Sequence, residues 1–390
     1  MKKLTCENMI IFLIFLLQTM SFVMTLNLNS IKFVSIILLN GLIIIFCFRN
    51  KMQKNELLIF LILLILLTGS CAFQNTSISG KITSITFYIT FLIWTLLSYK
   101  FINKRVHILY ISCGILFGVV IGLVLTFNEV ISQLASIYNT RSRLWGGFTH
   151  PNHLGGIISS SIIGLYVYNF IIKIEKRRNK FLYRIVLLTL IVLLYATKSR
   201  TSWIVTIVAI VIMNLRYIST KPKVFRIIMY VLLVIGSIYI GYFFITEYAL
   251  QQDAFTGRLL IFETMEVTPD TFLVGNGMVN AANLDRTNAN GGAMEMAWVM
   301  LFYKNGLIGV ISFISIILVL IKRLKRVENL SQLWAFRGVL TAFMIGTIGE
   351  AYMVNITNVP SMFNWVMLSV LSSNQFKINK IGEADESTIC

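Results

Sequence analysis

Long, nearly uninterrupted runs of apolar residues dominate this chain. The runs at 31–48, 57–73 and 227–245 hold almost no charge. Each reaches or approaches the roughly 20 residues with which a helix crosses about 30 Å of hydrocarbon. Twelve segments of this kind predict transmembrane helices, at 9–26, 31–48, 56–73, 82–98, 106–127, 153–173, 181–197, 201–216, 227–247, 294–320, 333–353 and 356–373.

Lys and Arg residues are distributed unevenly between the two sides of these predicted spans. With the N-terminus in the cytoplasm, 25 of the 34 Lys and Arg residues fall on the inner side and nine on the outer side. An excess of Lys and Arg in short loops marks the cytoplasmic side, so both termini are predicted to be cytoplasmic. The expected fold is an all-α polytopic membrane protein with about 12 transmembrane helices.

The domain organisation expected is one transmembrane domain over 1–376 and a cytoplasmic tail over 377–390. Two outer connections, about 128–152 and 248–293, are long enough to suggest a function. The composition, 57% hydrophobic and 13% charged, argues against a soluble fold. The net charge of +18 comes from juxtamembrane clusters such as 173–180 and 322–326, which suit anionic lipid headgroups, so no nucleic acid partner is expected.

Several arginines break this charge rule by falling on the predicted outer side. They are Arg141, Arg143, Arg200, Arg258 and Arg286. One interpretation is that each snorkels to headgroups or pairs with an outer carboxylate. The other is that the spans starting near 153, 201 and 294 point their N-terminal ends outward, where helix ends favour anions. Arginines beside such ends bind phosphate oxygens bidentately, which predicts a diphosphate ligand.

Two carboxylates and two histidines are the other candidates for chemistry. Glu295, at the outer mouth of a long apolar span, is either a general base or a first-turn carboxylate that complements the helix dipole. Glu350 is a second candidate, or else the counter-ion of an arginine. His150 and His153 have a spacing compatible with a shared metal, but nothing completes the ligand set, so no metal site is expected.

The outer loop at 248–293 has a recognisable internal pattern. Residues 256–267 predict a short helix that lies flat on the bilayer. The VGNGMVN and NANGG turns that follow favour either a mobile cover over a site or a plain solvated loop.

Four short motifs between Arg141 and Gly309 carry a family resemblance. They are RLWGGFTHPN, TKSRTSW, TGRLLIFETMEVTPDTFLVGNG and FYKNGLIG. In their order, spacing and predicted topology, these motifs resemble the bacterial O-antigen ligase and polymerase family, the WaaL and Wzy proteins. The resemblance implies a GT-C-like glycosyltransferase architecture in the bacterial cytoplasmic membrane, with the active site facing outward.

The chemistry that this resemblance implies is inverting, metal-independent glycosyl transfer from undecaprenyl diphosphate, without a cofactor. Carried onto this sequence, it makes Arg143, Arg200 and Arg258 the diphosphate ligands. In ligases a His-Asn pair typically lies about eleven residues before the glycine that starts the GLIG-like turn, and this chain has Glu295 and Met296 there. The departure favours a polymerase, with Glu295 as the residue that activates the acceptor hydroxyl.

The expected function is therefore polymerisation of undecaprenyl-diphosphate-linked oligosaccharide repeat units into O-antigen, capsular polysaccharide or exopolysaccharide. The expected partners are the lipid-linked glycan donor and acceptor, membrane lipids, and chain-length regulator and flippase proteins. Three alternatives stay open: a ligase that uses the same donor, a peptidoglycan-type polymerase, and a polysaccharide flippase or transporter without enzymatic activity. A transporter is expected to carry charges deep within several spans, whereas charge here collects at helix ends.

Overall fold

The computed structural model describes most of the transmembrane part of the chain. The described residues are 5–24, 29–50, 52–136, 143–219, 221–229, 268–277, 297–350 and 357–374, and the single positions 231, 236 and 355. Within these residues the regular elements are helices, together with one isolated bridge between Val23 and Phe148. The described part of the chain is thus all-α, as the sequence predicts.

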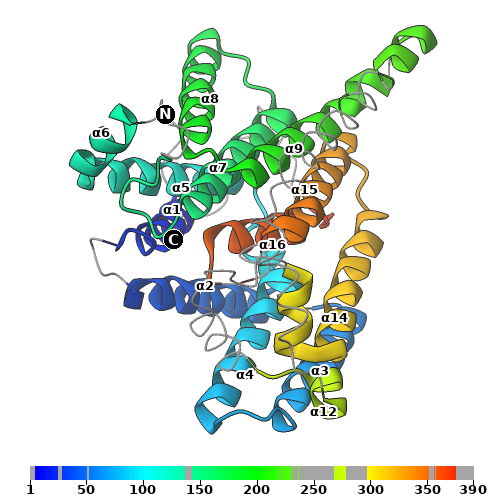
Figure 1. Cartoon of the computed structure of the whole chain (residues 1–390). Helices are drawn as coiled ribbons and strands as arrows, with labels where there is room; N and C mark the ends of the chain where they lie inside the picture. Colours follow the sequence, from blue (N-terminus) through cyan, green and yellow to red (C-terminus); the bar gives the residue numbers. More distant parts are fainter. Residues whose placement is uncertain are drawn as a thin grey trace.

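The helices gather into two groups on either side of a central one (Figure 1). The principal helices are α1 (Cys6–Met20), α2 (Asn29–Arg49), α3 (Lys54–Ala72), α4 (Ile78–Leu92), α5 (Arg105–Leu125), α6 (Phe127–Ala135), α7 (Pro151–Ile172), α8 (Arg177–Thr197), α9 (Arg200–Ser219), α12 (Pro269–Val274), α14 (Ala297–Leu324), α15 (Leu330–Gly349) and α16 (Val359–Leu371). A π-helical turn, η2 (Ile93–Leu97), and a 3-10 turn, η3 (Ser98–Lys100), continue α4. In Figure 1, α3, α4, α12 and α14 lie at the bottom, α7, α8 and α9 lie at the top, and α16 lies between.

Eight helices of the described part are long and apolar enough to cross a bilayer. They are Ile31–Arg49, Lys54–Ala72, Ile78–Lys100, Arg105–Leu125, Pro151–Ile172, Arg177–Thr197, Arg200–Ile218 and Ala297–Leu324. The chain is therefore a polytopic membrane protein, but the predicted number of twelve spans is not confirmed. Helices α1 and α16 are apolar but shorter, α15 is less apolar because it contains Gln332 and Arg337, and most of 227–247 lies outside the described residues.

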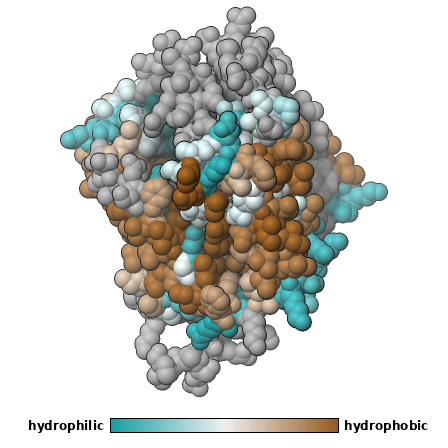
Figure 2. Space-filling view, turned by 90° about the horizontal axis from the view of Figure 1, so that it is seen from below, coloured by the Kyte–Doolittle hydropathy of each residue, from teal (hydrophilic) through white to brown (hydrophobic). Residues whose placement is uncertain are grey.

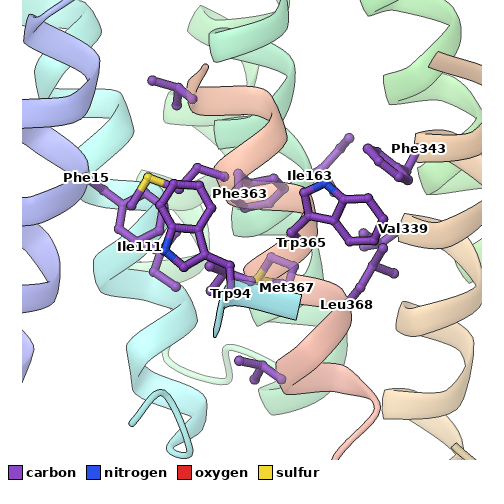
Figure 3. Close-up of a cluster of buried hydrophobic side chains, with 14 of the residues drawn as sticks. Phe15, Trp94, Ile111, Ile163, Val339, Phe343, Phe363, Trp365, Met367 and Leu368 are labelled. Atoms are coloured by element: carbon purple, nitrogen blue, oxygen red, sulfur yellow. The ribbon is translucent and has the colours of Figure 1, made fainter. Parts of the chain in front are cut away.

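Helix α16 forms the centre of the bundle. All 13 of its residues are buried, and it contacts α1, α5, α7, α14 and α15 as well as η2. The Trp365 ring lies edge-on to Phe343, with ring centroids 4.8 Å apart (Figure 3). It also lies edge-on to Phe91, with centroids 4.9 Å apart. Edge-to-face aromatic pairs contribute about 0.5–1.5 kcal/mol beyond their buried area. The predicted span 356–373 is thus a core helix enclosed by other helices.

The outer helices turn apolar rows toward the surroundings. On α3, Leu58, Leu61 and Ile65 are exposed at a spacing of three and four residues, which places them on one face. Only 22% of the apolar window of α3 is buried inside the bundle. Figure 2 shows the face seen from below in Figure 1, where brown groups form a broad band and teal groups lie mostly toward its edges. Such a band is what lipid tails require.

Helix α14 is interrupted at Gly306, and the interruption holds a distant segment. Gly306 has φ +60° and ψ −165°, a conformation that side chains other than glycine rarely adopt. The carbonyl groups of Tyr303 and Lys304 accept hydrogen bonds from the backbone N–H groups of Asn276 and Gly277, at 2.8 and 3.0 Å. Residues 274–277 of the predicted cover are therefore fixed to α14 and do not form a free loop.

Candidate functional site

The segment that precedes α7 makes a tight turn on the end of the bundle. Gly146 and Gly147 have φ values of +49° and +73°, so the paired glycines form the turn that the sequence predicts. On one side, the N–H of Leu144 donates to the carbonyl of Ala196 near the end of α8, at 2.9 Å. On the other, the N–H of Met24 after α1 donates to the carbonyl of Gly147, at 2.8 Å. The segment is held from both sides.

His150 and His153, the two histidines considered as metal ligands, make local contacts near the start of α7. Pro151 is its first residue, as expected, and the His150 ring caps the helix by accepting a hydrogen bond at Nδ1 from the N–H of Asn152, at 3.1 Å. Nδ1 of His153 lies 2.7 Å from Oγ1 of Thr149. Both rings therefore take part in local structure. No group of three or more His, Cys, Asp or Glu side chains within the described residues is arranged to hold a metal ion.

Arg143 spans the gap between this segment and the turn that joins α8 to α9. Its Nε donates to the carbonyl of Thr197 at 3.1 Å, and its Nη2 lies 3.5 Å from the carbonyl oxygen of Lys198. The same Nη2 donates to the side-chain oxygen of Asn152 in the first turn of α7. These contacts orient the guanidinium from two different elements.

Asn152 also forms a hydrogen bond to a carboxylate. Its Nδ2 donates to Oε1 of Glu350, at 2.9 Å. Glu350 caps the C-terminal end of α15 and is 7% exposed. One amide side chain thus links Glu350 to Arg143. The interpretation of Glu350 as an arginine's counter-ion stays a prediction.

Arg200 stands at the start of α9, directly after the turn that Arg143 holds. The turn is tight, since Lys198 has φ +49° and the N–H of Ser199 donates to Oγ1 of Thr197 at 3.2 Å. Helix α7 packs closely against it, because a Cβ atom on Gly155 would lie 2.6 Å from the Cβ of Ser199. Arg200 itself is exposed. The structure therefore brings Arg143 and Arg200 to the same end of the bundle.

The start of α14 lies at this end as well. Nε1 of Trp298 donates to Oγ1 of Thr347, at 3.1 Å, and Thr347 lies one helical turn before Glu350 on α15. The starts of α7, α9 and α14 therefore lie around the last turn of α15. The sequence alone does not show that these three helix ends converge. The predicted site residues Arg258 and Glu295 lie outside the described residues.

An open groove of about 600 Å³ lies at the same end, between α4 and α14. It is lined by Thr83, Phe87, Met300, Leu301, Lys304, Asn305, Asn355 and Thr357. Phe87, Met300 and Leu301 give it an apolar wall, whereas Lys304 and two amide side chains are polar. The groove therefore suits a molecule with an apolar part and an anionic or hydrogen-bonding part.

Asn152 is the residue of this site that sequence reasoning missed. Its position in the first turn of a helix that follows the Arg143 motif was visible, but its second partner, Glu350, is 198 residues away. The sequence alone does not reveal such a long-range partner.

Comparison of the sequence with protein-family models gives no match, and comparison with curated proteins gives none either. The resemblance to the O-antigen ligase and polymerase family therefore rests on the four short motifs. Of the residues that those motifs assign to the site, Arg143 and Arg200 are described and have the surroundings given above. The function is argued below from these surroundings.

Proposed function

We propose that this chain is a membrane glycosyltransferase that polymerises undecaprenyl-diphosphate-linked oligosaccharide repeat units. The product is O-antigen, capsular polysaccharide or exopolysaccharide, made on the outer face of the bacterial cytoplasmic membrane. A twelve-span topology with both termini in the cytoplasm belongs to this proposal. The observation that carries it is the place of Arg143, which is fixed where the starts of α7 and α9 meet.

This arrangement favours a ligand with several negative charges. Arg143 keeps its positive charge, and its guanidinium is fixed at this end of the bundle by hydrogen bonds to Thr197 and Asn152. The N-terminal ends of α7 and α9 add the positive ends of two helix dipoles. Arg200 adds a second guanidinium at the same end. A diphosphate, which carries several charged oxygens close together, fits this combination.

The proposed reaction is an inverting displacement at an anomeric carbon. A hydroxyl oxygen of the incoming lipid-linked repeat unit forms the new glycosidic bond. The bond between the anomeric carbon of the growing chain and the diphosphate breaks, and its electron pair leaves with undecaprenyl diphosphate. Glu295, two residues before the first residue of α14, accepts the hydroxyl proton. Arg143, Arg200 and Arg258 stabilise the negative charge of the leaving diphosphate.

The groove between α4 and α14 gives the lipid carrier a place in this proposal. Its apolar wall includes Phe87 and Leu301, and Lys304 lies among its polar residues. Leu301 lies about one turn along α14 from Trp298, which contacts the last turn of α15. The isoprenoid next to the diphosphate would lie along the apolar wall, with the phosphates directed toward the arginines.

Deletion of the gene and sizing of the surface glycan test the proposal. Loss of the polymerase leaves single repeat units on the surface acceptor. Long lipid-linked chains that stay unattached would identify a ligase instead, and repeat units trapped in the cytoplasm would identify a flippase. Glycan of unchanged length distribution would contradict all three assignments.

The assignment of site residues is tested by complementing the deletion with single variants. We expect Glu295→Gln and Arg258→Gln to leave the deletion phenotype in place while the membrane abundance of the protein is unchanged. Glu328→Gln is the matched control, because Glu328 is an exposed carboxylate in the connection between α14 and α15. Full-length glycan from both site variants would refute their roles.

A further inference from the structure

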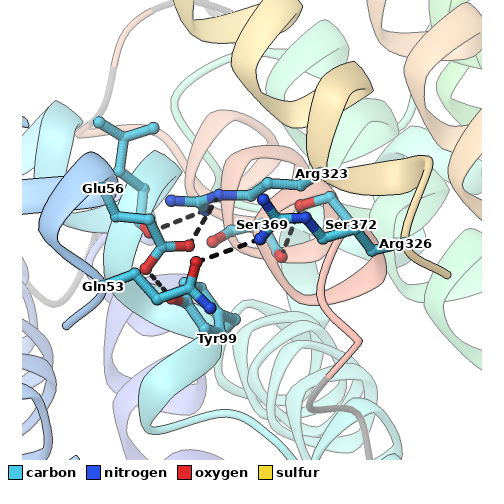
Figure 4. A network of polar contacts seen from close by, with 8 residues as sticks. Gln53, Glu56, Tyr99, Arg323, Arg326, Ser369 and Ser372 are labelled. Carbon is cyan, nitrogen blue, oxygen red and sulfur yellow. Dashed lines mark hydrogen bonds and ion pairs between the residues drawn. The ribbon is translucent and has the colours of Figure 1, made fainter. Parts of the chain in front are cut away.

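A second polar cluster lies at the far end of α14, where α3 begins. The hydroxyl of Tyr99 donates to Oε2 of Glu56 at 2.6 Å, and Nε of Arg323 lies 3.4 Å from Oε1 of the same carboxylate. Nη1 of Arg323 donates to the carbonyl of Leu96, at 2.9 Å. Figure 4 shows these side chains directed toward one another from α3, η3 and α14. Glu56 is thus held, and its charge is balanced, by groups of the protein.

This cluster is well separated from the candidate site. Beyond the interruption at Gly306, α14 continues to Leu324, and residues 307–324 alone extend about 27 Å at 1.5 Å per residue. Arg323 lies in its last turn, whereas Trp298 beside the candidate site lies in its first. The cluster is at the end of the bundle that the charge pattern predicts to face the cytoplasm.

An open groove of about 520 Å³ runs beside the cluster, between α3 and α14. The described residues that line it are Gln53, Asn55, Glu56, Ile59, Val319, Lys322, Arg323 and Arg326. Three of these eight are cationic and one is acidic, and the acidic one, Glu56, is the carboxylate beside Arg323. The groove therefore has an excess of positive charge. Nη1 of Arg326 donates to Oε1 of Gln53 at 3.1 Å, which connects its two sides.

The lining changes from polar to apolar along the groove. Ile59 lies one turn beyond Asn55 on α3, and Val319 lies about one turn before Lys322 on α14. Beside them, Leu58 and Leu318 are 58% and 59% exposed, on the surfaces that face lipid. The charged end of the groove thus lies at the helix ends, and the apolar end lies within the membrane-spanning segments.

We infer that this groove between α3 and α14 is a binding site for one anionic phospholipid. The phosphate contacts Lys322 and Arg326, the Gln53 and Asn55 amides bind headgroup oxygens, and an acyl chain lies on Ile59 and Val319. Basic residues beside the ends of transmembrane helices attract anionic headgroups, which are enriched in the cytoplasmic leaflet. Free phosphate would use the cations but not the apolar wall, so the two-part lining selects the lipid. This inference does not depend on the proposed function.

Native mass spectrometry of the full chain, purified in detergent and titrated with lipid, tests the site. We expect phosphatidylglycerol to be retained with at least tenfold preference over phosphatidylcholine. The double variant Lys322→Gln/Arg326→Gln should lower the affinity for phosphatidylglycerol about 30-fold, the effect of removing two cations near a headgroup. Lys221→Gln/Lys223→Gln is the matched control, because it removes the same charge from exposed positions outside the groove and outside both juxtamembrane clusters named above, and it should leave the affinity unchanged.

A second pair of variants tests the apolar half. Ile59→Gln/Val319→Gln keeps every charge of the groove and should weaken phosphatidylglycerol binding about tenfold. Thermal unfolding is measured for each variant without added lipid. An unfolding temperature equal to that of the wild type shows that the bundle is intact. Equal retention of phosphatidylcholine, equal loss in the control, or displacement of the lipid by millimolar inorganic phosphate would overturn the inference.

Discussion

Asn152 joins Arg143 to Glu350: its side-chain oxygen accepts from the guanidinium, and its Nδ2 donates to the carboxylate at 2.9 Å. One amide side chain therefore contacts both charged groups and helps to fix the position of each. Through Asn152, the guanidinium beside the start of α7 is linked to the last turn of α15.

Two substitutions test the hydrogen bond between Asn152 and Glu350, because together they exchange its donor and its acceptor. Asn152→Asp removes the donor to Glu350 and places two carboxylates side by side, so we expect a loss of about 1–3 kcal/mol in the free energy of unfolding. Adding Glu350→Gln supplies a donor from the other side and should restore most of the loss. Thermal unfolding in detergent measures both effects.

The control for this pair is Glu350→Gln alone. Its amide oxygen still accepts from Asn152, so its loss should be smaller than that of Asn152→Asp. If the double variant is no more stable than Asn152→Asp, the bridging contact does not contribute as described.

The two described arginines of the site should respond differently to substitution. Arg143→Lys keeps the charge but loses the planar set of donors that reaches three acceptors, so both stability and glycan polymerisation should fall. Arg200→Gln changes an exposed side chain, so stability should stay within about 0.5 kcal/mol. Polymerisation should nevertheless fall about 10²-fold, as expected for a lost charge-stabilising group.

Arg178→Gln provides the comparison for these arginine variants, since Arg178 is an exposed arginine at the opposite end of α8. The measurements are the length distribution of surface glycan and the unfolding temperature of the purified protein. Wild-type glycan from Arg200→Gln would remove Arg200 from the site.

Close packing at Gly155 should make the site sensitive to one methyl group. A Cβ there would lie 2.6 Å from the Cβ of Ser199, so Gly155→Ala must push α7 away from the turn before α9. We expect a loss of about 1–3 kcal/mol, typical of overpacking. Gly41→Ala is the control, because no atom lies within 4 Å of its Cβ position and alanine favours helix. Equal unfolding temperatures for the two variants would contradict the described packing.

The interruption of α14 gives a further prediction. Nε2 of Gln74 donates to the carbonyl groups of Val274 and Lys304, at 3.0 and 3.3 Å, and so reinforces the docking of residues 274–277. Gln74→Leu leaves those carbonyl groups without this donor, and Gly306→Ala strains the backbone at φ +60°. Both variants should increase cleavage near residues 274–277 in limited proteolysis. A cleavage pattern like that of Gly41→Ala would show that the docking does not depend on these contacts.

The sequence predicted the features that depend on local rules. Apolar run length predicted the membrane helices, the paired glycines predicted the turn at Gly146 and Gly147, and Pro151 begins α7 as expected. The sequence did not predict which residues contact one another across the bundle. Asn152 and Glu350 are far apart in the chain, and a hydropathy pattern does not distinguish a helix that faces lipid from one that faces other helices. For that reason hydropathy alone predicts an ordinary span at 356–373.

The burial of α16 has a consequence for how the protein is made. A helix of 13 residues extends about 20 Å, less than the roughly 30 Å of hydrocarbon, and none of its residues is exposed. It follows α1, α5, α7, α14 and α15 in the chain, yet it is the helix on which they converge. The earlier helices can pack against one another first, as α1 does on α5 and α5 on α7, and the contacts with α16 can form only after it has been synthesised.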